Sequence, residues 1–133
     1  MKIARFADRT AEFWIAMGPF FASSSVRKDM PYLVDRSGYN WFVATSDTGV
    51  VQGFVALDVT AKGASVHGLY VVPEFRSQKI AETLLKGAIK SARADKALPV
   101  KATVSPESLA LFTKLDFEPV GAAGKFTKVA LGS

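Results

Sequence analysis

Residues 69–85, LYVVPEFRSQKIAETLL, bring basic side chains to the start of a helix. An apolar run typical of a buried strand passes through Pro73, and Arg76 and Lys79 then precede an amphipathic helix. The first turn of a helix has unpaired N–H groups and the positive end of the helix dipole, which disfavour basic side chains there. A bound phosphate or pyrophosphate would resolve this conflict. An ordinary helix start capped by Ser77 is the alternative.

His67 is the side chain best suited to act as a general base, because an unperturbed imidazole titrates near neutral pH. It is the single histidine of the chain and lies on the strand that leads to the basic helix start. A packing role on the sheet is the more common one for such a histidine, so both interpretations stay open. Glu74, Tyr32, Tyr39 and Asp58 are weaker candidates for the base that the sequence does not place.

The elements that must position these groups follow from the periodicity of the apolar residues. Strands are predicted at residues 2–7, 41–46, 50–59, 64–72, 99–105, 117–121 and 125–131. Helices are predicted at residues 10–21, which Gly18 and Pro19 bend or end, at residues 25–34, at residues 77–94, and after Ser105, where a hydroxyl cap and Pro106 indicate a helix start. Turns are predicted at residues 47–49, 61–63 and 121–124. This order places antiparallel segments on either side of a β-α-β crossover.

The composition sets the class of protein. A chain of 133 residues with 49% hydrophobic and 22% charged residues suits one globular domain, so we expect a single domain over residues 1–133. The absence of cysteine favours a cytoplasmic protein, and with one histidine it argues against a metal site. No segment approaches the length of a membrane span, and the acidic Asp8 and Glu12 are unlike a secretory signal, so we expect a soluble protein.

The positive charge is concentrated in one stretch. Residues 62–101 hold eight basic and three acidic residues, an excess that equals the net charge of +5 for the whole chain. This distribution suits an anionic ligand, although lysines on a solvated helix face would produce the same pattern.

The junction, together with the later strand VKATV and the segment SPESLALFTKLDFEPVG, resembles the GCN5-related N-acetyltransferase (GNAT) superfamily over about residues 40–131. The resemblance implies an α/β (α+β) domain with a mixed, mostly antiparallel sheet flanked by helices, and acetyl-CoA as cosubstrate. In this family a Gln/Arg-x-x-Gly-x-Gly/Ala loop holds the pyrophosphate, and the matching positions here are Arg76, Ser77, Gln78, Lys79, Ile80 and Ala81. The resemblance also implies that backbone groups of Val71 and Val72 pair with the pantetheine arm.

The chain departs from the family pattern at several positions. Lys79 stands at the central glycine of the loop, and Ser77 stands where glycine is also frequent, so we expect a loop that is less free to approach a ligand. Phe112 replaces the tyrosine that in many members protonates the leaving thiolate. Either Ser105 or a water molecule would then be the proton donor. Ser105 stands at a position where asparagine often contacts the cofactor in this family.

The resemblance implies acetyl transfer to a primary amine of a small molecule or a protein, with the acceptor unidentified. The N-terminal helices and the loop that follows them, residues 19–41, are expected to select that acceptor. Two alternatives stay open: a CoA-binding module without catalysis, and a protein directed to nucleic acid, for example an enzyme acting on aminoacyl-tRNA. The resemblance also leaves open a homodimer formed through the last strand.

Overall fold

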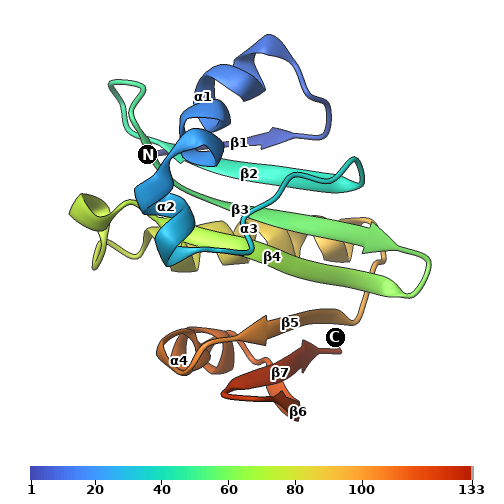
Figure 1. Ribbon diagram of the computed structural model, residues 1–133. Coiled ribbons are helices and arrows are strands. Elements are labelled where there is room, and N and C mark those ends of the chain that lie inside the picture. Colours follow the sequence, from blue (N-terminus) through green and yellow to red (C-terminus); the bar gives the residue numbers. More distant parts are fainter. Residues whose placement is uncertain (133) are drawn as a thin grey trace.

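The structure is a computed structural model that describes residues 1–132. The chain runs through β1 (Lys2–Phe6), α1 (Ala11–Ala22), α2 (Ser24–Asp29), β2 (Tyr39–Thr45), β3 (Val51–Thr60), β4 (Gly63–Val71), the 3-10 helix η1 (Pro73–Phe75), α3 (Ile80–Ala94), β5 (Val100–Val104), α4 (Pro106–Lys114), β6 (Glu118–Ala123) and β7 (Phe126–Leu131). In Figure 1 the helices α1 and α2 cover one face of the sheet and α3 lies behind the other. The predicted order of strands and helices is therefore confirmed.

A seven-stranded sheet has the order β1-β2-β3-β4-β5-β7-β6. Every neighbouring pair is antiparallel except β4 and β5, which are parallel and pair only at Ala64 with Val100 and at Ser65 with Lys101. Beyond these residues the two strands diverge, as Figure 1 shows. The predicted mixed sheet with a β-α-β crossover is confirmed, and the divergence opens its middle.

Close backbone contact holds β4 and β5 together at their first residues. The Ala64 N–H donates a hydrogen bond of 3.0 Å to the Pro99 carbonyl. A Cβ at Gly63 would lie 2.5 Å from that carbonyl oxygen, and φ there is +130°, so only glycine fits. The strands are thus tied at one end and free to part at the other.

The core lies on both faces of the sheet. Behind it, α3 buries Ile80, Leu84, Leu85, Ala88, Ile89 and Ala92, and a fully buried leucine contributes about 1.5–3 kcal/mol to folding. In front, Phe13 and Met17 of α1 pack on Trp41 and Phe54. The side chain of Trp41 is fully buried in this part of the core.

Three predicted boundaries were wrong. The helix predicted from residue 77 begins at Ile80, because Ser77 and Lys79 have positive φ angles of 70° and 61° that no right-handed helix contains. The helix predicted to reach residue 34 ends at Asp29, because Pro31 disfavours helical geometry at Met30. The predicted turn at residues 121–124 lies later, since β6 continues to Ala123. In addition, α1 continues through Pro19 to Ala22.

Candidate active site

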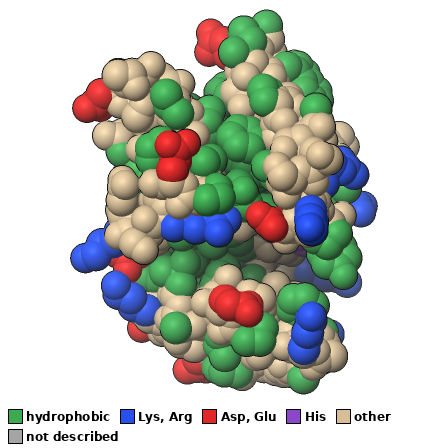
Figure 2. Space-filling model, turned by 60° about the vertical axis from the view of Figure 1, so that its left-hand side comes forward, with side chains coloured by type: hydrophobic (Ala, Val, Ile, Leu, Met, Phe, Trp, Pro, Cys, Tyr) green, Lys and Arg blue, Asp and Glu red, His purple; other side chains and the backbone are tan. Residues whose placement is uncertain are grey.

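Two cavities lie where β4 and β5 part. The smaller, of about 310 Å³, surrounds the start of α3 and includes the end of β4. The larger, of about 1030 Å³, is lined by β4, β5, residues 29–34 and the β6–β7 hairpin. Figure 2 shows a groove across the molecule, with hydrophobic side chains inside it, between the lower part and the rest. A long ligand that passes between the diverging strands would contact both cavities.

The backbone at the start of α3 curls tightly although it contains no glycine. Ser77 and Lys79 both adopt left-handed conformations, and Lys79 is the residue that caps the helix without any side-chain hydrogen bond. The first hydrogen bond at this end runs from the Thr83 N–H to the Lys79 carbonyl. In the described part of the chain, no backbone hydrogen bond is donated by the amides of residues 77–82. These amides form an N–H-rich cradle suited to an anion.

Six of the eight predicted cofactor residues line the smaller cavity. They are Val71, Arg76, Ser77, Lys79, Ile80 and Ala81. Gln78 and Val72 do not line it. The Val72 N–H donates to the Gln52 carbonyl and its own carbonyl accepts from Phe75, so both backbone groups of Val72 are already paired.

Val71 is the residue of β4 whose backbone faces the opening. Backbone groups of successive residues in an antiparallel pair alternate between the two sides of a strand. Because Val72 bonds to Gln52 on the β3 side, the N–H and C=O of Val71 point toward β5. The carbonyl accepts a 2.9 Å hydrogen bond from Arg76 Nε, and the guanidinium lies 5.4 Å from the centre of the Tyr70 ring. Arg76 therefore folds back over the end of the strand.

Glu82 and Lys114 also line the smaller cavity, and no pattern in the sequence had pointed to either. Lys114 at the end of α4 forms an ion pair with Glu82 in the first turn of α3, and Lys86 pairs with the same carboxylate at 3.5 Å. The hydrogen bond from Lys114 is the main cause that lowers the pKa of Glu82. With two lysines beside it, this carboxylate repels an incoming anion less than an unpaired one would.

His67 lies in the larger cavity with its ring stacked on Tyr39. The ring centroids are 5.1 Å apart and the planes are 10° from parallel. Partial burial is the main cause that lowers the pKa of His67, although the residue remains exposed to solvent on one side. Asp58 raises this pKa and Arg36 lowers it further. The imidazole is therefore neutral at pH 7, and neither of its nitrogens takes part in a hydrogen bond described in the structure.

The other candidates for the base are placed less well. Tyr39 is buried, which is the main cause that raises its pKa, so its phenol stays protonated at neutral pH. Tyr32 stands at the rim of the cleft with 81% of its surface exposed. Asp58 acts on His67 electrostatically, and Glu74 lines neither cavity.

Two serine hydroxyls lie beside Phe112 on the wall of the larger cavity. Phe112 is buried, and its ring packs edge-on against Phe117 at 5.0 Å. The sequence predicted that the Ser105 hydroxyl caps α4, but its side chain makes no capping hydrogen bond. Instead, the Ser105 hydroxyl donates to the Ser108 hydroxyl at 3.2 Å. Ser108 lies one helical turn before Phe112 on the same face of α4. Ser105 was predicted from the sequence as a proton donor, whereas Ser108 was not.

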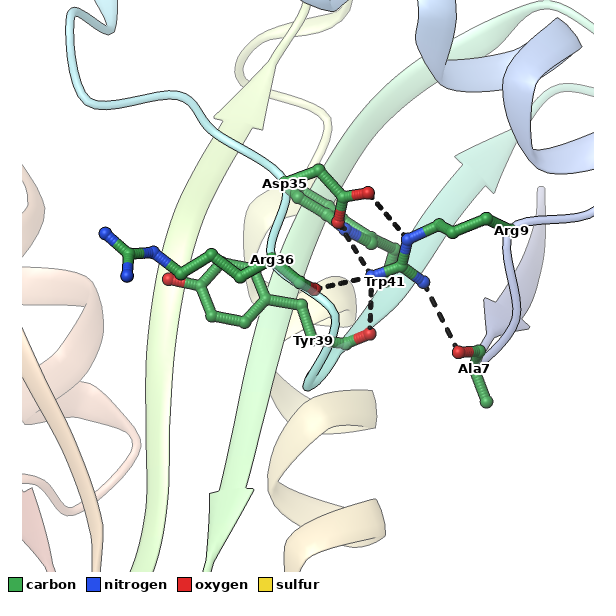
Figure 3. Close-up of polar contacts among 6 residues, drawn as sticks. All are labelled: Ala7, Arg9, Asp35, Arg36, Tyr39 and Trp41. Atoms are coloured by element: carbon green, nitrogen blue, oxygen red, sulfur yellow. Dashed lines mark hydrogen bonds and ion pairs between the residues drawn. The ribbon is translucent and has the colours of Figure 1, made fainter.

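The segment between α2 and β2 is held by an ion pair that the sequence did not indicate. Figure 3 shows Arg9 reaching Asp35 through two hydrogen bonds of 2.7 Å. The same guanidinium donates to the carbonyls of Arg36 and Tyr39, both at 2.9 Å, while Trp41 Nε1 donates to Asp35 at 2.8 Å. This clamp ties the segment before β2, part of which lines the cleft, to the residues that follow β1.

Within residues 1–132, no three His, Asp or Glu side chains gather as they would to hold a metal ion. None of the described helices is both long and apolar enough to cross a bilayer.

The family profile described as "Acetyltransferase (GNAT) domain" matches residues 14–131. Escherichia coli ElaA has a TM-score of 0.79 at 11% identity, covering 97% of each chain. The PaiA N-acetyltransferase of Thermoplasma acidophilum, solved with coenzyme A, has a TM-score of 0.70 at 17% identity over 100% of both chains. The E. coli ribosomal-protein-S18-alanine N-acetyltransferase has a TM-score of 0.71 at 15% identity, covering 98% of this chain and 94% of the other.

No curated protein matches the chain. The family match extends over most of the sequence, and the similar structures share the fold on which the two cavities are built. The chain belongs to the GNAT acetyltransferase family, and it is an acyltransferase enzyme.

Proposed function

We propose that this enzyme transfers the acetyl group of acetyl-CoA to a primary amine. The observation that carries the proposal is the pair of cavities at the parting of β4 and β5, with an N–H cradle in one and a neutral histidine in the other. A cosubstrate held by its phosphates at the cradle would direct its acyl end toward the histidine.

The residues at the start of α3 fit the phosphates of acetyl-CoA. The unpaired amides of residues 77–82 supply donors, and Arg76 and Lys79 supply charge beside them. The N–H of Val71 faces the opening and suits the pantetheine arm, whereas Val72 has no free backbone group for it. Arg76 would have to leave the Val71 carbonyl to meet a phosphate with its whole guanidinium, and that carbonyl would then be free as well.

His67 is the proposed base. Its neutral imidazole can accept a proton from the ammonium form of the acceptor, which leaves the acceptor nitrogen with the lone pair that attacks. It can also accept a proton from the attacking nitrogen as the new N–C bond forms. The stack on Tyr39 fixes the plane of the ring, and Arg36 and Asp58 set its electrostatic surroundings.

The hydroxyls of Ser105 and Ser108 form the proposed proton donor. Ser105 donates to Ser108, so the hydrogen of the Ser108 hydroxyl is free to point into the cleft. Bound acetyl-CoA supplies an acyl group on a thiol leaving group: the new N–C bond forms, the C–S bond breaks, and the thiolate takes up a proton. The hydroxyl pair would relay that proton from solvent to the thiolate sulfur, with each serine regaining the proton that it passes on, in the role of the tyrosine that Phe112 replaces.

The first test is the melting temperature with acetyl-CoA, CoA or ATP added. A ligand at 100 times its Kd stabilises the folded state by about 2.7 kcal/mol. We expect Lys79→Gln to weaken the binding of acetyl-CoA but not that of S-acetylpantetheine, which lacks the phosphates. Lys90→Gln, which lies outside both cavities, should change the binding of neither ligand. No shift with millimolar acetyl-CoA would contradict the proposal.

Transfer itself is measured as release of the CoA thiol with a panel of primary amines. Activity that falls at least tenfold in His67→Gln supports the proposed base. Tight binding of acetyl-CoA without transfer to any amine would favour the alternative of a CoA-binding module, for which Phe112 is the supporting observation.

A further inference from the structure

We infer that the acceptor amine carries an anionic group, a carboxylate or a phosphate, and that Lys101 and Lys128 bind this group; the inference rests on the proposed function. Both lysines line the larger cavity, on the wall formed by β5 and β7. His67 lies on the opposite wall, on β4.

The strand register brings the two lysines together on one face. In the β5–β7 pair, Lys101 lies opposite Ala130 and Thr103 lies opposite Lys128, so the lysines are diagonal neighbours. Diagonal neighbours in an antiparallel pair are about 7–8 Å apart, within reach of long side chains. The alternate residues Val100, Ala102 and Val129 are buried, which places both lysines on the cleft face of these strands.

The charge of this wall is not compensated. None of the ion pairs described in residues 1–132 involves Lys101, Lys128 or the neighbouring Lys125 of the β6–β7 turn. The charged residues that line the cavity are these three lysines and a single acid, Asp29. Like charges that share a cleft repel each other, and an anionic ligand relieves that repulsion.

The position relative to His67 connects the lysines to the acceptor. Ser65 pairs with Lys101 across the parallel strands, and His67 is the second residue after Ser65 on the same face of β4. With ideal strand spacing and rise, the Cα atoms of His67 and Lys101 would lie about 8 Å apart. The divergence of the strands after Ser65 adds to this distance, which the length of a lysine side chain helps to span. An ammonium on a lysine side chain can therefore approach a group a few bonds away from an amine at His67.

The phosphates of the cosubstrate do not account for these lysines. The N–H cradle, Arg76 and Lys79 lie in the smaller cavity, which neither Lys101 nor Lys128 lines. The two lysines line the cavity that holds the proposed base, which is where an acceptor must bind.

Binding to the protein loaded with CoA tests the inference without requiring turnover. Calorimetry would compare 4-aminobutyrate with propylamine, and O-phosphoethanolamine with ethanolamine. We expect at least one of the amines that carry an anionic group to bind tenfold or more tighter than its partner without that group, which corresponds to about 1.4 kcal/mol. The carboxylate and phosphate arms distinguish the two kinds of anion.

The double variant Lys101→Gln/Lys128→Gln should abolish the advantage of the anionic amine, while Lys62→Gln/Lys90→Gln, with both changes outside the two cavities, should keep it. The inference would be overturned if amines with and without the anionic group bound equally, or if none of them bound. It would also be overturned if the anionic amine kept its higher affinity in Lys101→Gln/Lys128→Gln. Failure of the proposed function is distinguished separately, because it would appear as absence of acetyl-CoA binding or of transfer.

Discussion

Replacing Ser77 by glycine tests the backbone geometry at the start of α3. Ser77 has a φ of 70°, in the left-handed region. A non-glycine residue there costs about 1–2 kcal/mol relative to a conformation without the clash. Glycine removes this cost but makes the unfolded chain more flexible, which takes back about 0.4–1 kcal/mol. We therefore expect Ser77→Gly to raise the free energy of unfolding by about 0.5–1 kcal/mol.

Gln78→Gly is the matched control. Gln78 is exposed, lies in the same loop and is not among the residues with positive φ. It receives the same glycine, so the effect on the unfolded chain is the same in both variants. The difference between them isolates the left-handed penalty, about 1–2 kcal/mol.

Calorimetric melting of both variants measures this difference. For a chain of 133 residues, an unfolding entropy of about 2.1 cal/mol/K per residue converts 1–2 kcal/mol into a gap of about 4–7 °C. Ser77→Gly should melt above the parent protein and Gln78→Gly slightly below it. Equal destabilisation by the two glycines would refute the left-handed conformation of Ser77 or its strain.

Three further predictions concern the cleft. Because the pKa of His67 is lowered, the rise of kcat/KM with pH should have its midpoint below 6.5, and His67→Gln should lack this rise. Asp35→Asn should lower the free energy of unfolding by about 2 kcal/mol and raise the KM of the amine more than that of acetyl-CoA. Asp47→Asn, whose ion pair is exposed, should change stability by under about 0.5 kcal/mol, and equal effects of the two variants would contradict the clamp. Ser108→Ala should lower kcat at least tenfold and Phe112→Tyr should restore it in that background; unchanged kcat in Ser108→Ala would rule out the hydroxyl pair as proton donor.

Local signals predicted the order of elements and the location of the cofactor loop. The apolar stripe of α3 repeats with helical period, and its burial against the sheet follows from that stripe. The basic residues Arg76 and Lys79 led to the prediction of an anion site because their charge conflicts with the helix dipole, a conflict that adjacent residues alone produce.

Single-residue preferences failed where the chain adopts conformations that its residue types disfavour. A helix was predicted from residue 77, but Ser77 and Lys79 adopt positive φ angles, which serine and lysine rarely do. Both ends of this loop are held by the surrounding fold, since Val72 is tied to β3 and Ile80 is buried beneath the sheet.

The sequence by itself determined which elements form, where the parallel crossover lies and that its helix is preceded by two basic residues, Arg76 and Lys79. Only the tertiary structure decided which residues meet: Arg9 with Asp35 across 26 positions, Glu82 with Lys114 between two helices, and His67 facing Lys101 and Lys128 across the opened sheet. The physical reason is one of range. Helix and strand periodicity arises among neighbours in the chain, whereas the register and divergence of β4 and β5 arise from the packing of the whole sheet on its helices.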